Sequence, residues 1–235
     1  MSKKIYIVIP TYNEAKNIEN VLEKIFDLKI DNLSVLVIDD NSPDGTGKIV
    51  EKLKIKNPAI DIMHRPGKAG LGRAYVAGFK EALSRGADYI IQMDADLSHD
   101  PRSIPSLIAA AADNDLVIGS RYIAGGGTSN WNFARRMVSR FGNRYARFVL
   151  GLKTHDITGG FRCYRRAVLE KIDLDRVDSV GFNFQIEVGY KAIKAGFKVK
   201  EVPIIFAERL EGKSKFSLKI FVESFWKVLK LKRQK

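Results

Sequence analysis

The sequence predicts an α/β protein with a mostly parallel central sheet flanked by helices, and three observations lead to that fold class. Short, wholly apolar runs alternate with amphipathic stretches through the first half of the chain, which is the β-α-β-α order of a parallel sheet. Apolar residues form 45% of the 235 residues, which is enough for a buried core and too many for a disordered chain. One cysteine and no run of about 18 apolar residues exclude a disulfide scaffold and a polytopic membrane protein.

Five apolar runs are expected to be strands, most of them buried on both faces. The first is expected to end at Pro10, because proline cannot donate a ladder hydrogen bond. The fourth is followed directly by the acidic residues Asp94 and Asp96. The runs cover residues 5–9, 35–38, 60–63, 89–93 and 116–119.

Apolar residues recur at helical spacing between these runs and again in the second half of the chain. Helices are therefore expected over residues 18–26, 49–53, 72–84, 101–112, 135–150, 184–195 and 217–231. The helix over 135–150 is basic, and its apolar side carries Met137, Val138, Phe141, Tyr145 and Phe148. We also expect a flexible loop at 125–127, a turn at 158–161 and a strand over 199–206.

Ligands of such a sheet bind beyond the carboxyl ends of its strands, and the densest polar chemistry of this chain lies there. Asp94 and Asp96 follow a buried strand, and carboxylates two residues apart in an extended chain project to the same side. Two oxygen ligands that face one way suit a hard divalent ion, which keeps waters and also binds a diphosphate. The same two residues could instead be one Asp that caps a turn and one solvated Asp in a loop. What favours a metal site is their position at the carboxyl end of a strand.

Other strand ends offer groups that suit a nucleoside. Asp39 can accept a hydrogen bond from a ribose hydroxyl or a base N–H, Tyr12 can stack on a base, and Glu14 can accept from a sugar. Turn capping by Asp39 and a favourable charge in the first turn of a helix for Glu14 are alternatives that the sequence leaves open. The glycine-rich basic loop 67–73 can neutralise phosphates, although it matches neither a P-loop nor a dinucleotide fingerprint.

The charge balance is strongly basic, since 40 Lys and Arg residues oppose 27 Asp and Glu residues, for a net charge of +13. This favours polyanionic partners such as nucleic acid, anionic lipid or phosphorylated substrates, without choosing among them. Arg135 and Ser139 share a helix face, where they can hold a phosphate or can simply be solvated. The three histidines lack zinc-site spacing, and Cys163 lies in an apolar and aromatic stretch typical of a buried structural thiol.

Seven ordered motifs, from about residue 4 to about residue 220, resemble a known family. Residues 8–14 (Val-Ile-Pro-Thr-Tyr-Asn-Glu) and 39–46 are similar to the corresponding segments of inverting family-two glycosyltransferases with the GT-A fold. The narrower resemblance is to dolichol-phosphate (polyprenol-phosphate) mannose synthases, and it rests on residues 93–99, 119–122, 156–162, 184–187 and 209–215. The QxxRW motif of processive polysaccharide synthases does not occur in the sequence.

The resemblance implies a GT-A type nucleotide-diphospho-sugar transferase, which moves mannose from GDP-mannose to dolichyl or polyprenyl phosphate with inversion and requires Mg²⁺ or Mn²⁺. It implies that Asp94, Asp96 and Arg121 are catalytic, and that the two carboxylates hold the metal. Arg135 and Ser139 match positions that contact the acceptor phosphate. The implied donor-binding residues are Pro10, Tyr12, Glu14, Val37, Asp39, Asp94, Ala95, Asp96, Arg121, Arg209 and Lys215.

The implied acceptor also fits the residue types present. An alcohol nucleophile needs a general base, whereas a phosphate monoester is already anionic near neutral pH. Such a site needs cations rather than a catalytic histidine. One departure from the family is Ser98, where some members have a Gln that assists the metal; here the hydroxyl assists more weakly or a water replaces it. The alternative function is a polyprenyl-phosphate glucosyltransferase that uses UDP-glucose.

Two units are expected, a catalytic domain over residues 1–215 and a C-terminal amphipathic basic helix over 216–235. The helix is expected to lie in a membrane interface, and the alternatives are packing on the sheet or docking to a small membrane-anchored subunit. Because no signal-peptide core is seen, we expect a cytoplasmic protein, peripheral on the cytosolic face of the membrane. A nucleic-acid partner is not expected, since the aromatic residues fall in strands and on apolar helix faces.

Overall fold

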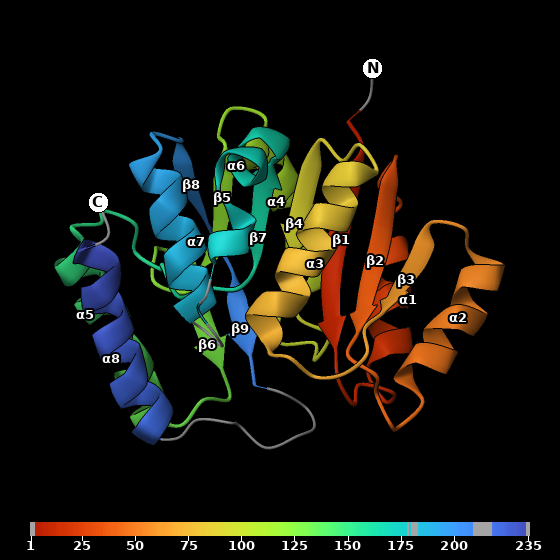
Figure 1. The fold of residues 1–235 in the computed structure, drawn as a ribbon, viewed down its shortest axis with the longest axis horizontal. Helices are drawn as coiled ribbons and strands as arrows, with labels where there is room; N and C mark the ends of the chain where they lie inside the picture. The colour runs from red at the N-terminus through yellow and green to blue at the C-terminus, as the bar shows by residue number, and fades with distance from the viewer. Residues whose placement is uncertain (1–2, 178, 180–182, 209–217, 234–235) are drawn as a thin grey trace.

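The structure, a computed structural model, describes residues 3–177, 179, 183–208 and 218–233 (Figure 1). The strands are β1 (Ile5–Thr11), β2 (Leu33–Asp39), β3 (Ile60–His64), β4 (Tyr89–Gln92), β5 (Leu116–Ser120), β6 (Gly127–Ser129), β7 (Arg162–Arg165), β8 (Val199–Pro203) and β9 (Ile205–Ala207). The helices are α1 (Ile18–Phe26), α2 (Thr46–Lys56), α3 (Leu71–Ser84), α4 (Ile104–Ala111), α5 (Phe133–Leu150), α6 (Arg166–Lys171), α7 (Asn183–Lys194) and α8 (Leu218–Arg233). Two short 3-10 helices are η1 (Pro101–Ser103) and η2 (Leu174–Arg176).

The central sheet has seven strands in the order β3-β2-β1-β4-β7-β5-β8. Every pairing in it is parallel except those of β7, which runs antiparallel between β4 and β5. Helices cover both faces of this sheet (Figure 1), so the predicted fold class is confirmed. A small second sheet pairs β6 with β9 in parallel.

Three details differ from what the sequence predicts. β7 was not expected, because it is short and has an arginine at each end; Arg162 is nevertheless fully buried and donates to backbone carbonyls of Ile157, Gly159 and Gln185. The expected loop at 125–127 ends in a strand, since Gly127 begins β6. The single strand expected over 199–206 is broken into β8 and β9, which belong to different sheets.

Both faces of the sheet are buried, and this explains why β1 is apolar at successive positions. Ile7 and Ile9 join the hydrophobic cluster of α1 and α4, whereas Tyr6 and Val8 join the cluster of α3 and α7. The helix α3 approaches the sheet very closely, because a Cβ atom added to Gly78 would overlap the side chain of Val8. This packing places the N-terminal end of α3 beside the loops that follow the strands.

A separate layer of α5 and α8 lies beyond one end of the sheet (left in Figure 1). Buried Val228 and Leu231 of α8 share a hydrophobic cluster with residues of α5 and α7. The rings of Tyr145 and Phe225 stack with their centroids 3.9 Å apart, and the Tyr145 hydroxyl donates to the Phe225 carbonyl. Within the described ranges, α8 therefore packs on other helices, and none of the helices there is long and apolar enough to cross a bilayer.

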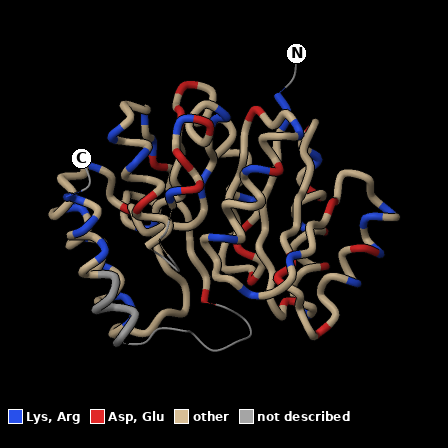
Figure 2. Tube along the Cα trace, in the orientation of Figure 1, with Lys and Arg blue, Asp and Glu red and all other residues tan. Residues whose placement is uncertain are grey.

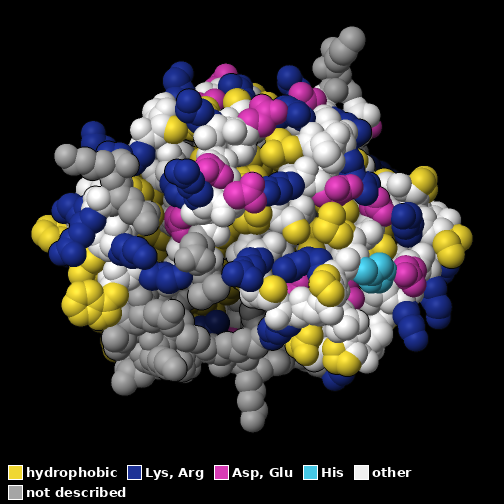
Figure 3. Space-filling view, viewed as in Figure 1, with side chains coloured by type: hydrophobic (Ala, Val, Ile, Leu, Met, Phe, Trp, Pro, Cys, Tyr) yellow, Lys and Arg dark blue, Asp and Glu magenta, His cyan; other side chains and the backbone are white. Residues whose placement is uncertain are grey.

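The predicted apolar side of α5 is mostly its exposed side. Phe141 is 59% and Phe148 is 87% exposed, whereas the buried face of the helix consists of Asn143, Ala146, Val149 and Leu150. Lys and Arg residues run along α5 and α8 (Figure 2), and hydrophobic side chains stand beside them at the same edge of the surface (Figure 3). Exposed apolar strips of this kind are typical of interaction surfaces.

Candidate active site

The carboxyl ends of β1, β2 and β4 lie side by side at one edge of the sheet (lower edge in Figure 1), because these strands are parallel neighbours. Four polar segments directly follow predicted strands, and this edge brings together three of them, residues 10–14, 39–44 and 94–99. The fourth segment, with Arg121, follows β5, and β7 lies between β5 and β4. The loops that follow β1, β2 and β4 therefore lie together, and the loop with Arg121 lies farther along the same edge of the sheet.

Asp94 is held from two sides. Its Oδ1 accepts a hydrogen bond from the Tyr75 hydroxyl of α3 at 2.7 Å, and its backbone N–H donates to His99 Nδ1 at 3.0 Å. Burial raises the pKa of Tyr75 well above its ordinary value, and the charge of Asp94 raises it further. Tyr75 therefore stays protonated and orients the carboxylate, whose side chain is 23% exposed.

Asp96 is oriented by the residues that follow it. Its Oδ1 accepts hydrogen bonds from the Ser98 hydroxyl at 2.5 Å and from the Ser98 backbone N–H at 3.1 Å. Between them, Leu97 has a φ of 60°, which is rare for a leucine and persists only where neighbouring contacts enforce it. Ser98, at the position where some relatives have a Gln, thus contacts the Asp96 carboxylate directly.

The two carboxylates are candidate ligands for a divalent metal, whose other ligands would arrive with the substrate. Mg²⁺ and Mn²⁺ prefer oxygen ligands and commonly use one or two carboxylates together with waters and substrate phosphates. No group of three or more His, Cys, Asp and Glu side chains is placed to hold a metal within the part of the chain that the structure describes. His99 Nδ1 accepts from the Asp94 N–H, and the carboxylates that this turn offers are those of Asp94 and Asp96.

Asp39 acts as a turn cap at the end of β2. Its Oδ1 accepts from Thr11 Oγ1 at 3.1 Å and from Ser42 Oγ at 2.6 Å, and its Oδ2 accepts from the Ser42 N–H at 3.1 Å. The neighbouring Asp40 pairs with Arg65 at 2.6 Å, and burial raises the pKa of Asp40 although Arg65 opposes the shift. The capping role is therefore present, and the ribose contact of Asp39 stays a prediction.

The remaining predicted nucleoside contacts occupy different environments. Tyr12 is half-buried, and Lys68 Nζ lies 4.1 Å from the centre of its ring, which joins the glycine-rich loop to the end of β1. Glu14 accepts from Asn17 Nδ2 at 2.9 Å just before α1, in keeping with a helix-start role. Pro10 is half-buried in β1, whereas Val37 is fully buried in the core, so the Val37 side chain does not reach the surface.

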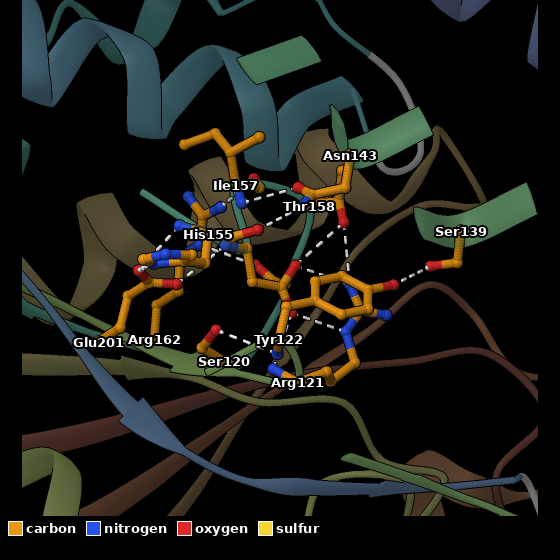
Figure 4. Close-up of polar contacts among 12 residues, drawn as sticks. Ser120, Arg121, Tyr122, Ser139, Asn143, His155, Ile157, Thr158, Arg162 and Glu201 are labelled. Atoms are coloured by element: carbon orange, nitrogen blue, oxygen red, sulfur yellow. Dashed lines mark hydrogen bonds and ion pairs between the residues drawn. The ribbon is translucent and has the colours of Figure 1, made fainter. Parts of the chain in front are cut away.

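Arg121 is engaged in a buried ion pair (Figure 4). Its Nε and Nη2 donate to the two oxygens of Asp156 at 2.7 and 2.8 Å, and Nη2 also donates to Thr158 Oγ1 at 2.8 Å. Burial alone would raise the pKa of Asp156, but the Arg121 charge and its hydrogen bonds hold the pKa below its ordinary value. The Arg121 side chain is only 8% exposed, so its predicted phosphate contact stays a prediction.

Asp156 is a site residue that sequence reasoning missed, although it begins the motif 156–162. Its backbone N–H and that of His155 donate to the Glu201 carboxylate, both at 2.8 Å (Figure 4). On the other side, the Asn143 side chain of α5 accepts from the Ile157 N–H and donates to the His155 carbonyl. The loop that positions Arg121 is thus fixed by β8 and by α5 together.

The predicted acceptor residues lie on one helix, since α5 contains both Arg135 and Ser139. Arg135 Nη1 donates to Glu208 at 2.8 Å, and its guanidinium lies 4.2 Å from the Trp131 ring. Ser139 Oγ is 2.7 Å from the Tyr122 hydroxyl. Two further predicted phosphate contacts lie outside the described residues, Arg209 and Lys215.

The motif over residues 184–187 and the single cysteine, Cys163, have structural roles within the described residues. Gln185 of α7 accepts from Gln92 Nε2 at 2.7 Å inside the core, and Glu187 accepts from Lys191 at 2.7 Å one turn along the same helix. Cys163 is fully buried in β7, and burial raises the pKa of its thiol to about 12. The prediction of a buried structural thiol is therefore confirmed.

The sequence is similar to characterised glycosyltransferases over most of its length. Residues 6–173 match the model of the family described as Glycosyl transferase family 2. The chain is 46% identical over 229 residues to the polyprenol monophosphomannose synthase of Mycolicibacterium smegmatis, covering 97% of this chain and 86% of that protein. It is 44% identical over 214 residues to the undecaprenyl-phosphate mannosyltransferase of Micrococcus luteus, covering 91% of this chain and 88% of that one.

Solved structures share the fold at low sequence identity. The mannosyltransferase PcManGT from Pyrobaculum calidifontis, in complex with GDP-Man and Mn²⁺, superposes with a TM-score of 0.66 at 18% identity, covering 98% of this chain and 65% of that one. Glucosyl-3-phosphoglycerate synthase from Mycobacterium tuberculosis, with Mn²⁺, UDP-glucose and phosphoglyceric acid, gives a TM-score of 0.66 at 18% identity, covering 98% and 78%. Both likenesses bear on the fold, and both neighbours were crystallised with a divalent metal.

Proposed function

The chain belongs to glycosyl transferase family 2, and we propose that it transfers mannose from GDP-mannose to a polyprenyl phosphate with inversion at the anomeric carbon. The observation that carries the proposal is the pair of held carboxylates, Asp94 and Asp96, at the carboxyl end of β4. Mannose and a polyprenyl phosphate acceptor are supported by the two relatives with 44–46% identity, and GDP by the neighbour crystallised with GDP-Man.

The acceptor phosphate is the nucleophile of the proposed reaction. One phosphate oxygen attacks C1 of mannose while the bond between C1 and the diphosphate oxygen breaks, so that C1 inverts and GDP leaves. A phosphate monoester, with a second pKa of about 6, is largely a dianion at neutral pH, so no side chain has to remove a proton. When bound, a divalent ion at Asp94 and Asp96 supplies positive charge to the leaving diphosphate. Arg135 provides positive charge for the incoming anion.

A transfer assay tests the sugar, the nucleotide and the metal together. We expect radiolabelled mannose from GDP-mannose to enter the organic phase with a polyprenyl phosphate acceptor, and EDTA to lower the rate at least about a hundredfold until Mg²⁺ or Mn²⁺ is restored. UDP-glucose, assayed in parallel, is expected to give no lipid-linked glucose. Transfer from UDP-glucose with inert GDP-mannose would instead establish the glucosyltransferase, and full activity in EDTA would remove the metal from the proposal.

The exposed face of α5 supports a peripheral position on an anionic membrane surface. Phe141 and Phe148 protrude from α5, and Trp226 of the neighbouring α8 is 67% exposed. Cations flank these rings on the same helix, namely Arg136, Arg140 and Arg144. Aromatic side chains enter the headgroup boundary and cations favour anionic lipids, so this combination suits a lipid surface. The sequence predicted such docking for the C-terminal helix, whereas among the described side chains α5 also exposes aromatic rings, those of Phe133, Phe141 and Phe148.

Vesicle co-sedimentation tests the membrane proposal. The Phe141→Ser/Phe148→Ser variant is expected to bind anionic phosphatidylglycerol vesicles about a hundredfold more weakly than the unchanged chain, because each ring contributes about 1.5 kcal/mol or more of burial. Ile55→Ser on α2, where the side chain is 86% exposed, is the matched control and should bind normally. If the unchanged chain stays in the supernatant at low salt, direct docking is wrong and a small membrane-anchored partner takes its place. A location on the cytosolic face stays a prediction.

A further inference from the structure

Tyr122 follows β5 and contacts both Arg121 and the helix α5. Its hydroxyl is 2.7 Å from Ser139 Oγ on α5, and its ring lies 5.2 Å from the guanidinium carbon of Arg121 (Figure 4). We propose that the Tyr122 hydroxyl, together with Ser139, binds the acceptor phosphate, which adds Tyr122 to the acceptor-binding residues. The inference rests on the proposed function, since it assigns a further contact to the same phosphate.

The hydroxyls of Tyr122 and Ser139 leave one O–H available as a hydrogen-bond donor to a ligand. Tyr122 and Ser139 each carry one O–H, and only one of the two hydrogens can lie between their oxygens. Whichever atom donates, the other O–H is directed away from the pair. Both side chains are half-buried, so the pair is partly shielded from water. A phosphate oxygen there accepts a charge-assisted hydrogen bond, which is stronger than one between neutral groups.

The surroundings of the pair suit an anion. Arg135 precedes Ser139 by one helical turn on the same face of α5. Its partner Glu208 is 45% exposed and Arg135 itself is 29% exposed, so their ion pair contributes little and can give way to a phosphate. Arg121 is different, because its charge is balanced by the buried Asp156. The acceptor anion is therefore expected to meet Arg135 and the O–H that the hydroxyl pair leaves free.

The backbone of Tyr122 is fixed before any ligand arrives. The N–H of the preceding Arg121 donates to Asp156 at 3.0 Å, and the N–H of Tyr122 itself approaches Ser120 Oγ at 3.4 Å (Figure 4). Such preorganisation lowers the entropy lost on binding. Tyr122 keeps its proton throughout the transfer: the held phosphate forms the bond to C1 with one oxygen, while its other oxygens accept the hydrogen bonds.

Steady-state kinetics of Tyr122→Phe, Ser139→Ala and the double variant test this assignment with a short-chain, water-dispersible polyprenyl phosphate. Tyr122→Phe removes only the hydroxyl, and we expect the acceptor KM to rise about tenfold, as for a lost hydrogen bond to a charged group. The KM for GDP-mannose and the melting temperature should stay close to those of the unchanged chain. The double variant should lose less than the product of the two single effects, because the hydroxyls act as a pair. Tyr145→Phe removes a hydrogen-bonded hydroxyl elsewhere on α5 and is the matched control.

Several outcomes would overturn the assignment. An unchanged acceptor KM in Tyr122→Phe, or an equal rise in the KM for GDP-mannose, would remove Tyr122 from the acceptor site. An effect of the same size in Tyr145→Phe would show a general response of α5 rather than a contact of Tyr122. Failure of the unchanged chain to use polyprenyl phosphate at all is a separate result: it would refute the proposed function, and the assignment of Tyr122 with it.

Discussion

Asp96→Ala is expected to lower kcat for mannose transfer by at least about a thousandfold while the chain still folds. The variant removes one of the two carboxylates that fit the metal, so the leaving diphosphate loses its main source of positive charge. The fold loses the hydrogen bonds that Asp96 accepts from Ser98 along with its other contacts, and each net bond lost corresponds to about 1 kcal/mol and a fall of about 2–4 °C in Tm. The transfer assay gives kcat, calorimetry gives the affinity for GDP with Mn²⁺, and circular dichroism reports the fold.

Asp113→Ala is the matched control for this variant. Asp113 is an exposed aspartate between α4 and β5, at the amino edge of the sheet and away from the strand-end carboxylates. Its removal should change neither transfer nor metal-dependent GDP binding. Near-normal transfer by Asp96→Ala would place the metal site elsewhere, and a loss of the folded circular dichroism signal would show that Asp96 is needed mainly for structure.

Asp156→Ala is expected to destabilise the folded chain by about 3–5 kcal/mol, because it leaves the Arg121 guanidinium buried without its counter-charge. Urea unfolding measures this free energy, and a fall in Tm of about 10 °C should accompany it. Replacing both partners, in Arg121→Met/Asp156→Leu, should recover part of the loss, since no charge is then left unpaired. A change below about 1 kcal/mol in Asp156→Ala would contradict the buried pair.

The difference in unfolding free energy between the unchanged chain and Asp156→Ala depends on pH, because the pKa of Asp156 is lowered in the folded chain. A carboxyl whose pKa is lower in the folded than in the unfolded chain adds stability that is fully present above its ordinary value of 3.8 and is lost as the pH falls through the folded value. The gap in unfolding free energy between the unchanged chain and Asp156→Ala should therefore be constant near neutral pH and should shrink below about pH 4. Urea titrations at several pH values measure it, and a constant gap down to pH 2 would contradict the shift.

Part of the site was predictable because it follows from short-range rules. A wholly apolar run followed by Asp94 and Asp96 predicts a buried strand that ends in two carboxylates, and parallel pairing places this turn beside the end of β1. The spacing of Arg135 and Ser139 predicts a shared helix face, and α5 contains both. Each of these inferences needs only the local period of the chain and the rule for parallel strands.

The environment of Arg121 was beyond such rules. Its partner Asp156 lies 35 positions away in the sequence. The backbone of Asp156 donates to Glu201 of β8, and the next residue, Ile157, donates to Asn143 of α5. The strand β7 that follows is antiparallel and has arginines at both ends, so its pattern does not resemble a buried strand. A buried arginine is tolerated there because three backbone carbonyls accept its hydrogen bonds, and sequence alone does not show which carbonyls will be near.

The sequence by itself determined the α/β class, the order of the principal strands and helices, and the turn that carries Asp94 and Asp96. These depend on periodicity and turn chemistry, which are properties of neighbouring residues. Only the tertiary structure decided which face of α5 is covered, which partner holds Arg121 and that Tyr122 meets Ser139. A helical period groups Phe141 and Phe148 on one face, but whether that face is buried depends on which other elements pack there. Here α7 and α8 cover the face with Ala146 and Leu150 and leave the phenylalanines exposed.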